Sequence, residues 1–429
     1  MRLGGRLSAA IDVLNDIFSN HTSAAAALHE WGRGHRFAGS GDRSAIGNLV
    51  YDALRQKPQI AAQMGSDSSR ALVLGVASTL WGLEVDEIEA AMAEKFGPGP
   101  LSDQELSAIK TPLAAKQPVW VSGNFPQWLA PSYTSAFGED AARQGAALAE
   151  RAPVDLRVNS LKTSRDELLA EFAKFGAIEG PLSPLSIRIP APQGQKRSPN
   201  VEIEAAHGKG WFEVQDSASQ IVSLLASAKS GDIVIDLCAG AGGKSLAMAA
   251  AMNNEGILYA YDKDKRRLRP IFERIARSGA KNVEVIPADQ PQQLEGLSGK
   301  ADIVFVDAPC SGAGSWRRKP DGKWRLKEAT LAQRIKDQKA VLASGAKLVK
   351  PGGRLIYVTC SVLPQENTAQ VRSFLEQARD FSLVPYGPVW RDNIDGNPPI
   401  SADGETETLL LTPASHGTDG FFIAILQKQ

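Results

Sequence analysis

The stretch Ile233–Ser245, which reads IVIDLCAGAGGKS, joins a short apolar run to a loop that contains three glycines. The apolar run is typical of a buried strand of a parallel sheet. Glycines allow the backbone to turn tightly and to approach a ligand, and a helix that follows such a loop directs its N-terminus toward that ligand. We therefore expect a strand, a ligand-binding loop and a helix, which together form the first unit of an open α/β sheet.

From about residue 215 onward, short apolar runs alternate with helical stretches. This alternation predicts a doubly wound, mostly parallel sheet of seven strands with helices on its faces. One long helix is expected over Glu328–Leu348. The expected strands are residues 233–237, 257–261, 283–287, 303–306 and 355–358, a weaker one at Val384, and a last one over 420–426.

Two further regions precede this sheet, because a chain of 429 residues is too long for one ordinary domain. Residues 1–145 are rich in Ala and Leu at helical spacing, and we expect an all-helical domain that binds RNA or protein. Residues 146–214 alternate apolar and polar positions in two short runs, and Ser164 opens a helix between them, which predicts a small α+β module with a role in RNA binding. Residues 215–429 then hold the large sheet.

The composition narrows the class of protein. Lys and Arg together number 48, as do Asp and Glu, so contacts to a nucleic acid would have to come from local basic patches. The three cysteines form no disulfide framework, and the five scattered histidines show no metal-ligand spacing. No apolar run is long enough to span a membrane, and Asp12 and Asp16 interrupt the N-terminal apolar pattern that a signal peptide would need. We expect a cytoplasmic, monomeric enzyme that binds no metal and whose cysteines are reduced.

Carboxylates at the ends of the expected strands indicate what the glycine loop binds. Asp262 ends the second strand, where a carboxylate can accept hydrogen bonds from ribose hydroxyls, and Asp289 ends the third, where it can contact an adenine edge. The loop lacks the GxGxxG spacing and the full pattern of a phosphate-binding loop, so an adenosyl cofactor without pyrophosphate fits better than a nicotinamide dinucleotide. A dehydrogenase is the alternative. The candidate cofactor contacts are Cys238, Ala239, Gly240, Ala241, Gly242, Gly243, Lys244, Asp262, Asp289 and Asp307.

Two of the three cysteines occupy matching positions. The segments Asp307-Ala308-Pro309-Cys310 and Thr359-Cys360-Ser361 each follow an apolar, strand-like run. Because open α/β sheets hold their ligands at the strand ends, we expect both thiols and the Asp307 carboxylate to border one crevice. A carboxylate and two thiols suit covalent chemistry on a pyrimidine ring.

Several longer blocks carry a family resemblance. The blocks DLCAGAGGKS, YDKDKRRL, ADIVFVDAPCSGAGSWRRKPDGKW and GGRLIYVTCSVLPQEN, with GWFEVQDSAS before them, resemble those of the Sun/RsmB family of RNA cytosine-5 methyltransferases. The resemblance covers residues 150–429 and implies a Rossmann-like class I methyltransferase sheet with S-adenosylmethionine as cofactor. Residues 5–140 are similar, more weakly, to the NusB-like helical domain of the bacterial ribosomal RNA members. The chain departs from the family at Ala241, where many members have Pro; a small residue there leaves the loop amides free.

The resemblance also implies roles for the site residues. Cys360, in the Thr-Cys-Ser block, is the expected nucleophile; its thiolate adds to carbon 6 of cytosine and so enables carbon 5 to attack the methyl group. Asp307 is expected to hydrogen-bond the base, and Cys310 to assist the release of the product. DNA cytosine-5 methyltransferases use a Pro-Cys nucleophile, which would assign that role to Cys310 instead.

The implied substrate is a flipped cytidine in single-stranded or looped RNA, with 16S ribosomal RNA as the expected source and transfer RNA as the alternative. A ribosome-assembly factor that binds RNA without catalysis is a further alternative, which the intact carboxylate and thiols disfavour. The basic run after Cys310 interleaves charges with tryptophan, which suits phosphate contacts and base stacking. Its candidate RNA-binding residues are Arg317, Arg318, Lys323, Trp324 and Arg325.

Overall fold

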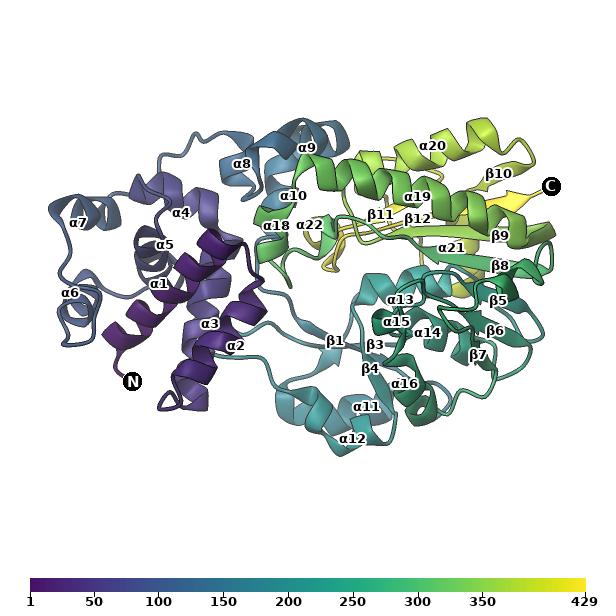
Figure 1. Cartoon of the computed structure of the whole chain (residues 1–429), viewed down its shortest axis with the longest axis horizontal. Helices are drawn as coiled ribbons and strands as arrows, with labels where there is room; N and C mark the ends of the chain where they lie inside the picture. Colours follow the sequence, from purple (N-terminus) through teal and green to yellow (C-terminus); the bar gives the residue numbers. More distant parts are fainter.

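The computed structural model describes the whole chain, residues 1–429, and its C-terminal half is built on one large sheet (Figure 1). The strands of this sheet are β5 (Ile233–Asp236), β6 (Ile257–Ala260), β7 (Val283–Val285), β8 (Ala301–Asp307), β9 (Val349–Thr359), β10 (Phe381–Val384), β11 (Leu409–Leu411) and β12 (Phe421–Lys428). Five neighbours are parallel in the order β9-β8-β5-β6-β7. Beside β9, the antiparallel strands β12 and β10 extend the sheet, and β11 pairs with β12.

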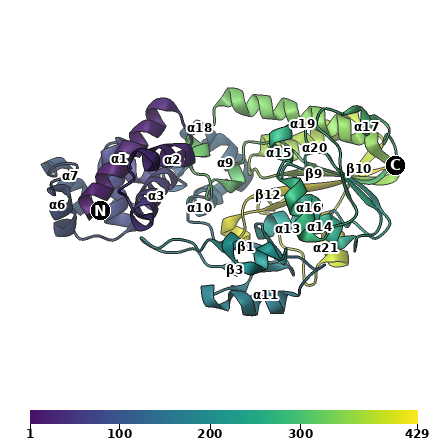
Figure 2. The same cartoon turned by 60° about the horizontal axis from the view of Figure 1, so that its bottom comes forward.

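Consecutive side chains of the central strands enter two apolar cores, one on each face of the large sheet. In β8, Ile303 and Phe305 belong to one core, whereas Val304 and Val306 belong to the other. Figure 2 shows α19 and α20 on one face and α13, α14 and α16 on the opposite face. These helices are α13 (Ser217–Leu224), α14 (Gly243–Ala251), α16 (Ile271–Ser278), α19 (Glu328–Leu348) and α20 (Thr368–Gln377). Because both faces are covered, the strands are continuous apolar runs in the sequence.

The seven expected strands of the large sheet are present, and the long helix α19 has the expected bounds. The eighth strand, β11, was not predicted because three residues are too short to show a period. The chain adds β6 and β7 on one side of β5, and then places β8 and β9 on the other side. Ligands of open α/β sheets bind at such a reversal of strand order, outside the carboxyl ends of the strands. We therefore expect the functional site at the carboxyl ends of β5 and β8.

The shorter helices of this half complete the covering of the sheet or lie in its connections. They are α15 (Lys265–Leu268), α17 (Gln292–Glu295), η6 (Ala313–Ser315), α18 (Asp321–Arg325), η7 (Pro364–Glu366), α21 (Tyr386–Asn393) and α22 (Pro413–His416). Figure 1 shows α18 at the side of the large sheet that faces the N-terminal helices. This position makes α18 the natural contact between the two halves of the molecule.

A helical domain, residues 3–110, forms the N-terminal end of the molecule (Figure 1). Its elements are α1 (Leu3–Asn20), α2 (Ala24–Gly34), α3 (Ser40–Arg55), α4 (Lys57–Met64), α5 (Ser69–Gly75), η1 (Val76–Leu80), α6 (Val85–Met92) and α7 (Asp103–Lys110). Apolar residues at helical spacing, such as Leu7, Leu14 and Leu49, are fully buried in one core. No helix of the chain is long and apolar enough to cross a membrane.

The next helices belong to a different core. They are α8 (Val119–Ser122), η2 (Gln127–Leu129), α9 (Ala130–Phe137), η3 (Gly138–Asp140) and α10 (Ala141–Ala147). Phe125, Leu129 and Tyr133 pack with the side chains of β8 and β9, not with the helical domain. The helices expected to form one domain over residues 1–145 thus divide between two cores, a division that helical periodicity alone cannot show.

A small antiparallel sheet, residues 154–214, lies between the helical domain and the large sheet (Figure 2). Its elements are β1 (Val154–Val158), α11 (Arg165–Phe172), η4 (Ala173–Phe175), β2 (Ile178–Glu179), β3 (Ser186–Ile189), η5 (Val201–Ile203), α12 (Ala205–Gly208) and β4 (Phe212–Val214), with strand order β2-β3-β1-β4. Ser164 caps α11 by accepting a hydrogen bond from the Glu167 amide. Asp155 of β1, fully buried, accepts from Arg188 of β3 and from the Ser217 amide at the start of α13. This carboxylate joins the small sheet to the large one.

Candidate active site

The glycine loop between β5 and α14 takes the conformation that its residues allow. Gly242 precedes α14 with φ of 83°, and a Cβ atom there would meet the Ile271 side chain at 2.4 Å. A glycine is therefore required at this position. The Gly240 amide donates to Oδ2 of Asp262 at 3.0 Å, which holds the loop against the end of β6.

This loop forms one wall of a cavity of about 220 Å³ at the carboxyl ends of β5 and β8. Seven of the expected cofactor contacts line it: Cys238, Ala239, Gly240, Ala241, Gly243, Lys244 and Asp307. Sequence reasoning missed its other lining residues, which are Val214, Gln215, Ser219, Asp236, Arg267 and Arg274. The structure thus brings most of the expected contacts together, along with residues from β4, α13, α15 and α16 to which the sequence analysis assigned no role.

The two remaining carboxylates at the strand ends differ. Asp262 is 2% exposed, and its second oxygen accepts from the Asp264 amide, so it stands at the edge of the glycine loop. Asp289 is exposed, does not line the cavity and accepts no hydrogen bond. β7 ends at Val285, before this residue, and the contact of Asp289 with an adenine edge stays a prediction.

Asp236 is the cavity residue with the most unusual environment. The Ser245 hydroxyl donates to its Oδ2 at 2.6 Å, whereas its Oδ1 is buried without a hydrogen-bond partner. Burial, together with the charge of Asp307, raises the pKa of Asp236 to about 7. An acceptor in this state favours a ligand group that donates a hydrogen bond or carries a positive charge. Its sequence signal was available, since Asp236 ends the strand that leads into the glycine loop.

The two strand-end thiols are in contact. The Sγ atoms of Cys310 and Cys360 lie 3.3 Å apart. The segment after Cys310 is fixed to the end of β9, because the Gly314 amide donates to the Cys360 carbonyl at 2.9 Å and the Gly420 amide donates to the Gly314 carbonyl at 2.8 Å. A Cβ atom at Gly314 would meet the Gly420 carbonyl oxygen at 2.0 Å, so this close approach of three chain segments depends on glycine.

Asp307 connects the thiols to the cavity. Lys244 donates to its Oδ2 at 2.7 Å, and the same ammonium lies 5.2 Å from the centre of the Phe421 ring. Burial alone would lower the pKa of Lys244, but the charge and the hydrogen bond of Asp307, together with smaller contributions from Cys360 and Asp236, raise that pKa. Lys244 therefore presents an ammonium, paired with the Asp307 carboxylate, beside the thiols.

Glu366 holds the segment that carries Cys310. It is fully buried and accepts hydrogen bonds from both the amide and the hydroxyl of Ser311, and from Gln338 of α19 at 3.0 Å. The hydrogen bond with Cys360 and burial raise the pKa of the Cys310 thiol, and the Glu366 charge adds to this effect. Cys310 therefore keeps its proton near neutral pH. Sequence reasoning assigned no role to Glu366, although it lies in the quoted block that contains Cys360.

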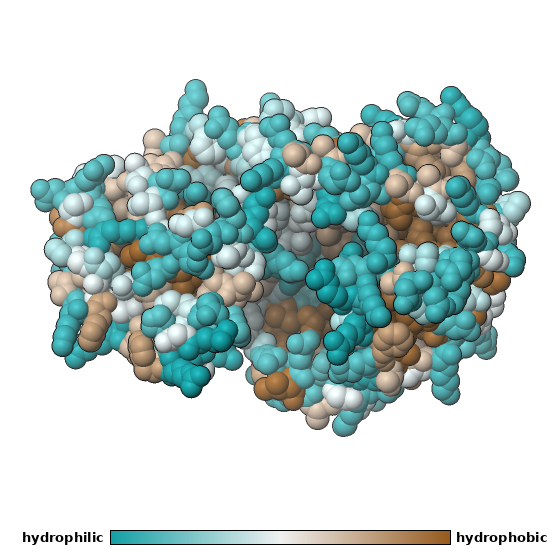
Figure 3. Space-filling model, viewed as in Figure 1, coloured by the Kyte–Doolittle hydropathy of each residue, from teal (hydrophilic) through white to brown (hydrophobic).

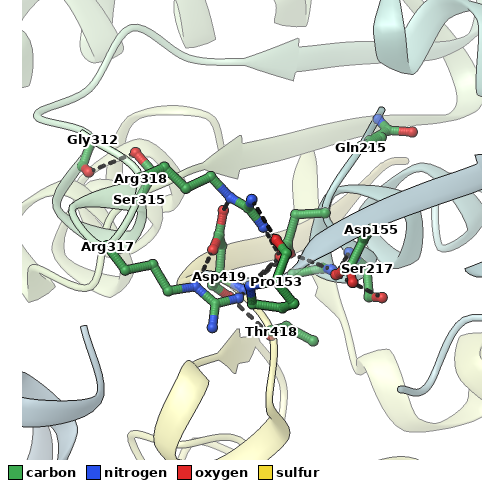
Figure 4. A network of polar contacts seen from close by, with 12 residues as sticks. Pro153, Asp155, Gln215, Ser217, Gly312, Ser315, Arg317, Arg318, Thr418 and Asp419 are labelled. Carbon is green, nitrogen blue, oxygen red and sulfur yellow. Dashed lines mark hydrogen bonds and ion pairs between the residues drawn. The ribbon is translucent and has the colours of Figure 1, made fainter. Parts of the chain in front are cut away.

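The basic run after Cys310 is placed differently from the expectation. Arg317 is buried and, with Arg318, pairs with the buried carboxylates of Asp216 and Asp419 (Figure 4). Arg318 also donates to the Pro153 carbonyl at 2.9 Å, at the entry to the small sheet. The expectation that Arg317 provides an RNA phosphate contact is wrong, since both of its ion-pair partners are internal carboxylates; Arg318 is 30% exposed, and its three nitrogens donate to Asp419, the Pro153 carbonyl and Asp216.

The second half of the run contacts the helical domain. Lys323 is 1% exposed and donates to the carbonyls of Arg55 and Asn124 at 2.9 and 2.7 Å, and the Trp324 indole donates to the Leu54 carbonyl at 2.7 Å. The expectations of a phosphate contact from Lys323 and of base stacking by Trp324 are therefore wrong in this conformation. Arg325 is exposed and pairs with Asp321 one turn earlier on α18.

No group of three or more His, Cys, Asp or Glu side chains is placed to hold a metal ion. The site brings together two thiols, a carboxylate–ammonium pair and a cavity with a glycine loop.

Comparison with known proteins identifies the family to which the chain belongs. Residues 223–427 match the model described as 16S rRNA methyltransferase RsmB/F, and residues 125–194 match the RsmF/B-like ferredoxin-like domain. A Synechocystis protein named probable ribosomal RNA small subunit methyltransferase B is 32% identical over 316 residues, which cover 71% of this chain and 67% of that protein. Ribosomal RNA small subunit methyltransferase B of Cronobacter sakazakii is 33% identical over 71% of this chain and 66% of its own length. The crystal structure of PH0851 has the same fold, with a TM-score of 0.73 and 24% identity over 100% of this chain and 99% of that one.

Proposed function

Since the chain belongs to the RsmB/F family of 16S rRNA methyltransferases, we propose that it transfers a methyl group from S-adenosylmethionine to carbon 5 of a cytidine in 16S ribosomal RNA. The observation that carries this proposal is the contact of the two thiols, 3.3 Å apart, beside the Asp307–Lys244 pair at the rim of the cavity. Carbon 5 of cytosine is a poor nucleophile, and a thiol that adds to the ring is the means of activating it.

The cavity residues fit the cofactor. S-adenosylmethionine carries a sulfonium and an ammonium, and the unpartnered Oδ1 of Asp236 offers such a group an acceptor. The glycine loop lets the backbone approach the ligand closely, and Asp262, which accepts from the Gly240 amide of that loop, is the proposed acceptor for the ribose hydroxyls. When bound, the cofactor supplies the methyl group as an electrophile.

Cys360 is the proposed nucleophile. Its thiolate forms the Sγ–C6 bond, and the electrons of the C5–C6 double bond move onto the ring, where the charge is stabilised by the groups around Asp307. Addition of Cys360 would make carbon 5 nucleophilic toward the methyl group that a cofactor held by the glycine loop would supply. The hydrogen bond with Cys360 and burial raise the pKa of Cys310, which disfavours Cys310 as the attacking thiolate.

Release of the product completes the proposed reaction. A base removes the proton from carbon 5, the C5–C6 double bond forms again, and the Cys360 thiolate leaves from carbon 6. Cys310, in contact with Cys360, is placed to assist this elimination. Asp307, which Lys244 contacts at 2.7 Å, is the proposed acceptor of a hydrogen bond from the exocyclic amine of the base.

The proposal is tested with purified protein, S-adenosylmethionine and either 16S ribosomal RNA or transfer RNA, followed by bisulfite sequencing. We expect a new protected cytidine in 16S ribosomal RNA. Protection in transfer RNA alone would identify transfer RNA as the substrate instead. Protection in neither RNA would contradict the proposal. Cys360→Ala should reduce turnover by at least about 10³-fold and retain cofactor binding in calorimetry, because it removes the covalent route.

Cys310→Ala should give the opposite signature. We expect a covalent protein–RNA adduct to accumulate on a denaturing gel, because addition proceeds while elimination slows. The matched control is the Cys310→Ala/Cys360→Ala double variant, which should form no adduct. An adduct in Cys360→Ala, and none in Cys310→Ala, would exchange the roles of the two thiols.

A further inference from the structure

A second cavity lies where the helical domain, the small sheet and the segment after Cys310 meet. It has a volume of about 260 Å³. The face shown in Figure 3 is hollowed at the junction between the helical domain and the rest of the molecule. Five arginines and one tyrosine line the cavity, and no Asp or Glu does. These six residues are Tyr51, Arg55, Arg151, Arg197, Arg317 and Arg318. They come from α3, from the linker before β1, from the loop after β3 and from the segment after Cys310.

The guanidinium groups around this cavity outnumber their carboxylate partners. Arg55 and Arg151 share the single carboxylate of Asp52, with distances of 3.0 and 2.9 Å. Arg317 and Arg318 share Asp216 and Asp419, as described above, and both carboxylates lie outside the lining.

Arg197 is exposed and makes neither an ion pair nor a hydrogen bond. The cavity therefore has an excess of positive charge, although the chain as a whole has a formal net charge of zero.

The crowding of these positive charges lowers the pKa of basic side chains around the cavity. Burial lowers the pKa of Arg55, and the neighbouring Arg151 lowers it further. Lys323 lies behind Arg55, and burial together with the Arg55 charge lowers its pKa to about 7. A bound anion would relieve this repulsion, so the cavity is built for a negatively charged ligand.

We propose that this cavity binds the sugar–phosphate backbone of the substrate RNA beside the target cytidine. The inference rests on the proposed function and adds the RNA-binding surface, which involves all three parts of the chain. Arg318 follows Cys310 in the same segment, and the Gly314 amide holds that segment to Cys360, so RNA in the cavity contacts the segment that carries Cys310. Arg317 supports this surface from within through its internal ion pairs.

The remaining groups of the cavity suit RNA better than an isolated phosphate. Tyr51 is half-buried and offers a ring on which a base can stack. The loop that carries Arg197 is held to the helical domain, because Asn48 donates to the carbonyls of Gln195 and Lys196 at 3.1 Å. Arg197 is thus presented at the mouth of the cavity on an anchored loop.

The experiment measures binding of a short fluorescein-labelled single-stranded RNA by anisotropy, with the full-length protein at several KCl concentrations. Arg197→Ala should weaken binding about five-fold, the effect of one contact to phosphate, and lower the salt slope by about 0.7. Arg197→Glu should weaken it further, and Arg197→Lys should restore part of the affinity. The matched control is Arg391→Ala on α21, which removes an exposed, unpaired arginine outside the cavity and should leave RNA affinity unchanged.

Competition for RNA binding and the methylation assay distinguish failure of this inference from failure of the proposed function. Inorganic phosphate or polyglutamate that displaces the RNA at equal charge concentration would overturn the assignment to an RNA backbone. Wild-type affinity and salt slope in both Arg197→Ala and Arg197→Glu would also overturn it, even when the wild-type protein methylates RNA. If the wild-type protein binds RNA through Arg197 but methylates none, the proposed function fails and this inference stands. Unchanged S-adenosylmethionine binding in calorimetry would show that the variants are folded.

Discussion

The basic run Arg317–Arg325 and the loop 191–200 are both rich in positive charge in the sequence, yet the structure uses them in opposite ways. The run contains five basic residues, and two of them, Arg317 and Lys323, are buried. The loop contains only Lys196 and Arg197, and both are exposed. The stretch with more charge thus places part of its charge inside the molecule, whereas the stretch with less keeps both of its charges on the surface.

The difference teaches that the partners of a charge decide its use. Lys323 donates to the carbonyl of Arg55, the last residue of α3, and Trp324 donates to that of Leu54. These carbonyls have no partner within their helix, and the end of a helix attracts a positive charge. The run therefore docks the helical domain onto the catalytic half, whereas Arg197 has no protein partner and is available to a ligand.

The largest effect that tests this comparison is expected from Asp419→Ala. It leaves the buried Arg317 and the partly buried Arg318 with Asp216 alone, and breaking such a network costs about 3–5 kcal/mol of unfolding free energy. Urea denaturation measures the loss. Asp395→Ala, which removes an exposed carboxylate without a partner, should change stability by less than about 0.5 kcal/mol. Equal losses of unfolding free energy in both variants would show that the buried network stabilises the fold no more than an exposed carboxylate does.

A smaller, pH-dependent effect is expected from Lys323→Met. The folded-state pKa of about 7 lies below the usual 10.5, so between these values the unfolded chain binds more protons and stability rises with pH. The unfolding free energy of the wild-type protein relative to the variant should therefore rise by about 2 kcal/mol between about pH 7 and pH 9. Lys319→Met, in the exposed part of the same run, is the matched control and should show no such trend. A flat difference for Lys323 would mean that it stays charged throughout.

Residues close in sequence explain what could be predicted. The strands were found because both faces of the sheet are covered, so that Ile303 through Val306 are all apolar. The glycine loop and the two thiols were found because each follows such a strand directly, and the structure brings Cys310 and Cys360 into contact. For the strands, the glycine loop and the two thiols, neighbouring residues in the sequence were sufficient for the prediction.

The interior position of the basic run could not be predicted, because its partners are distant in the chain. Asp216 and Asp419 lie 101 and 102 residues from Arg317 on either side, and nothing local marks them as its partners. Strand ends are also poorly defined by apolar pattern: β7 ends at Val285, whereas the pattern predicted residues 283–287. Charges and strand ends are thus the features for which sequence periodicity gives the least information.

The smallest effect is expected where the comparison is most direct, with one substitution made at two places. Arg197→Ala should change the unfolding free energy by less than about 0.5 kcal/mol, because the side chain is exposed and unpaired. Arg317→Ala, the same chemical change, leaves Asp216 and Asp419 with Arg318 alone and should cost several-fold more. RNA affinity should rank the exposed position the other way, because Arg197 makes its contact only when RNA is bound. A stability loss at Arg197 as large as that at Arg317 would mean that the loop, too, is held by its charge, and the contrast between the two basic regions would disappear.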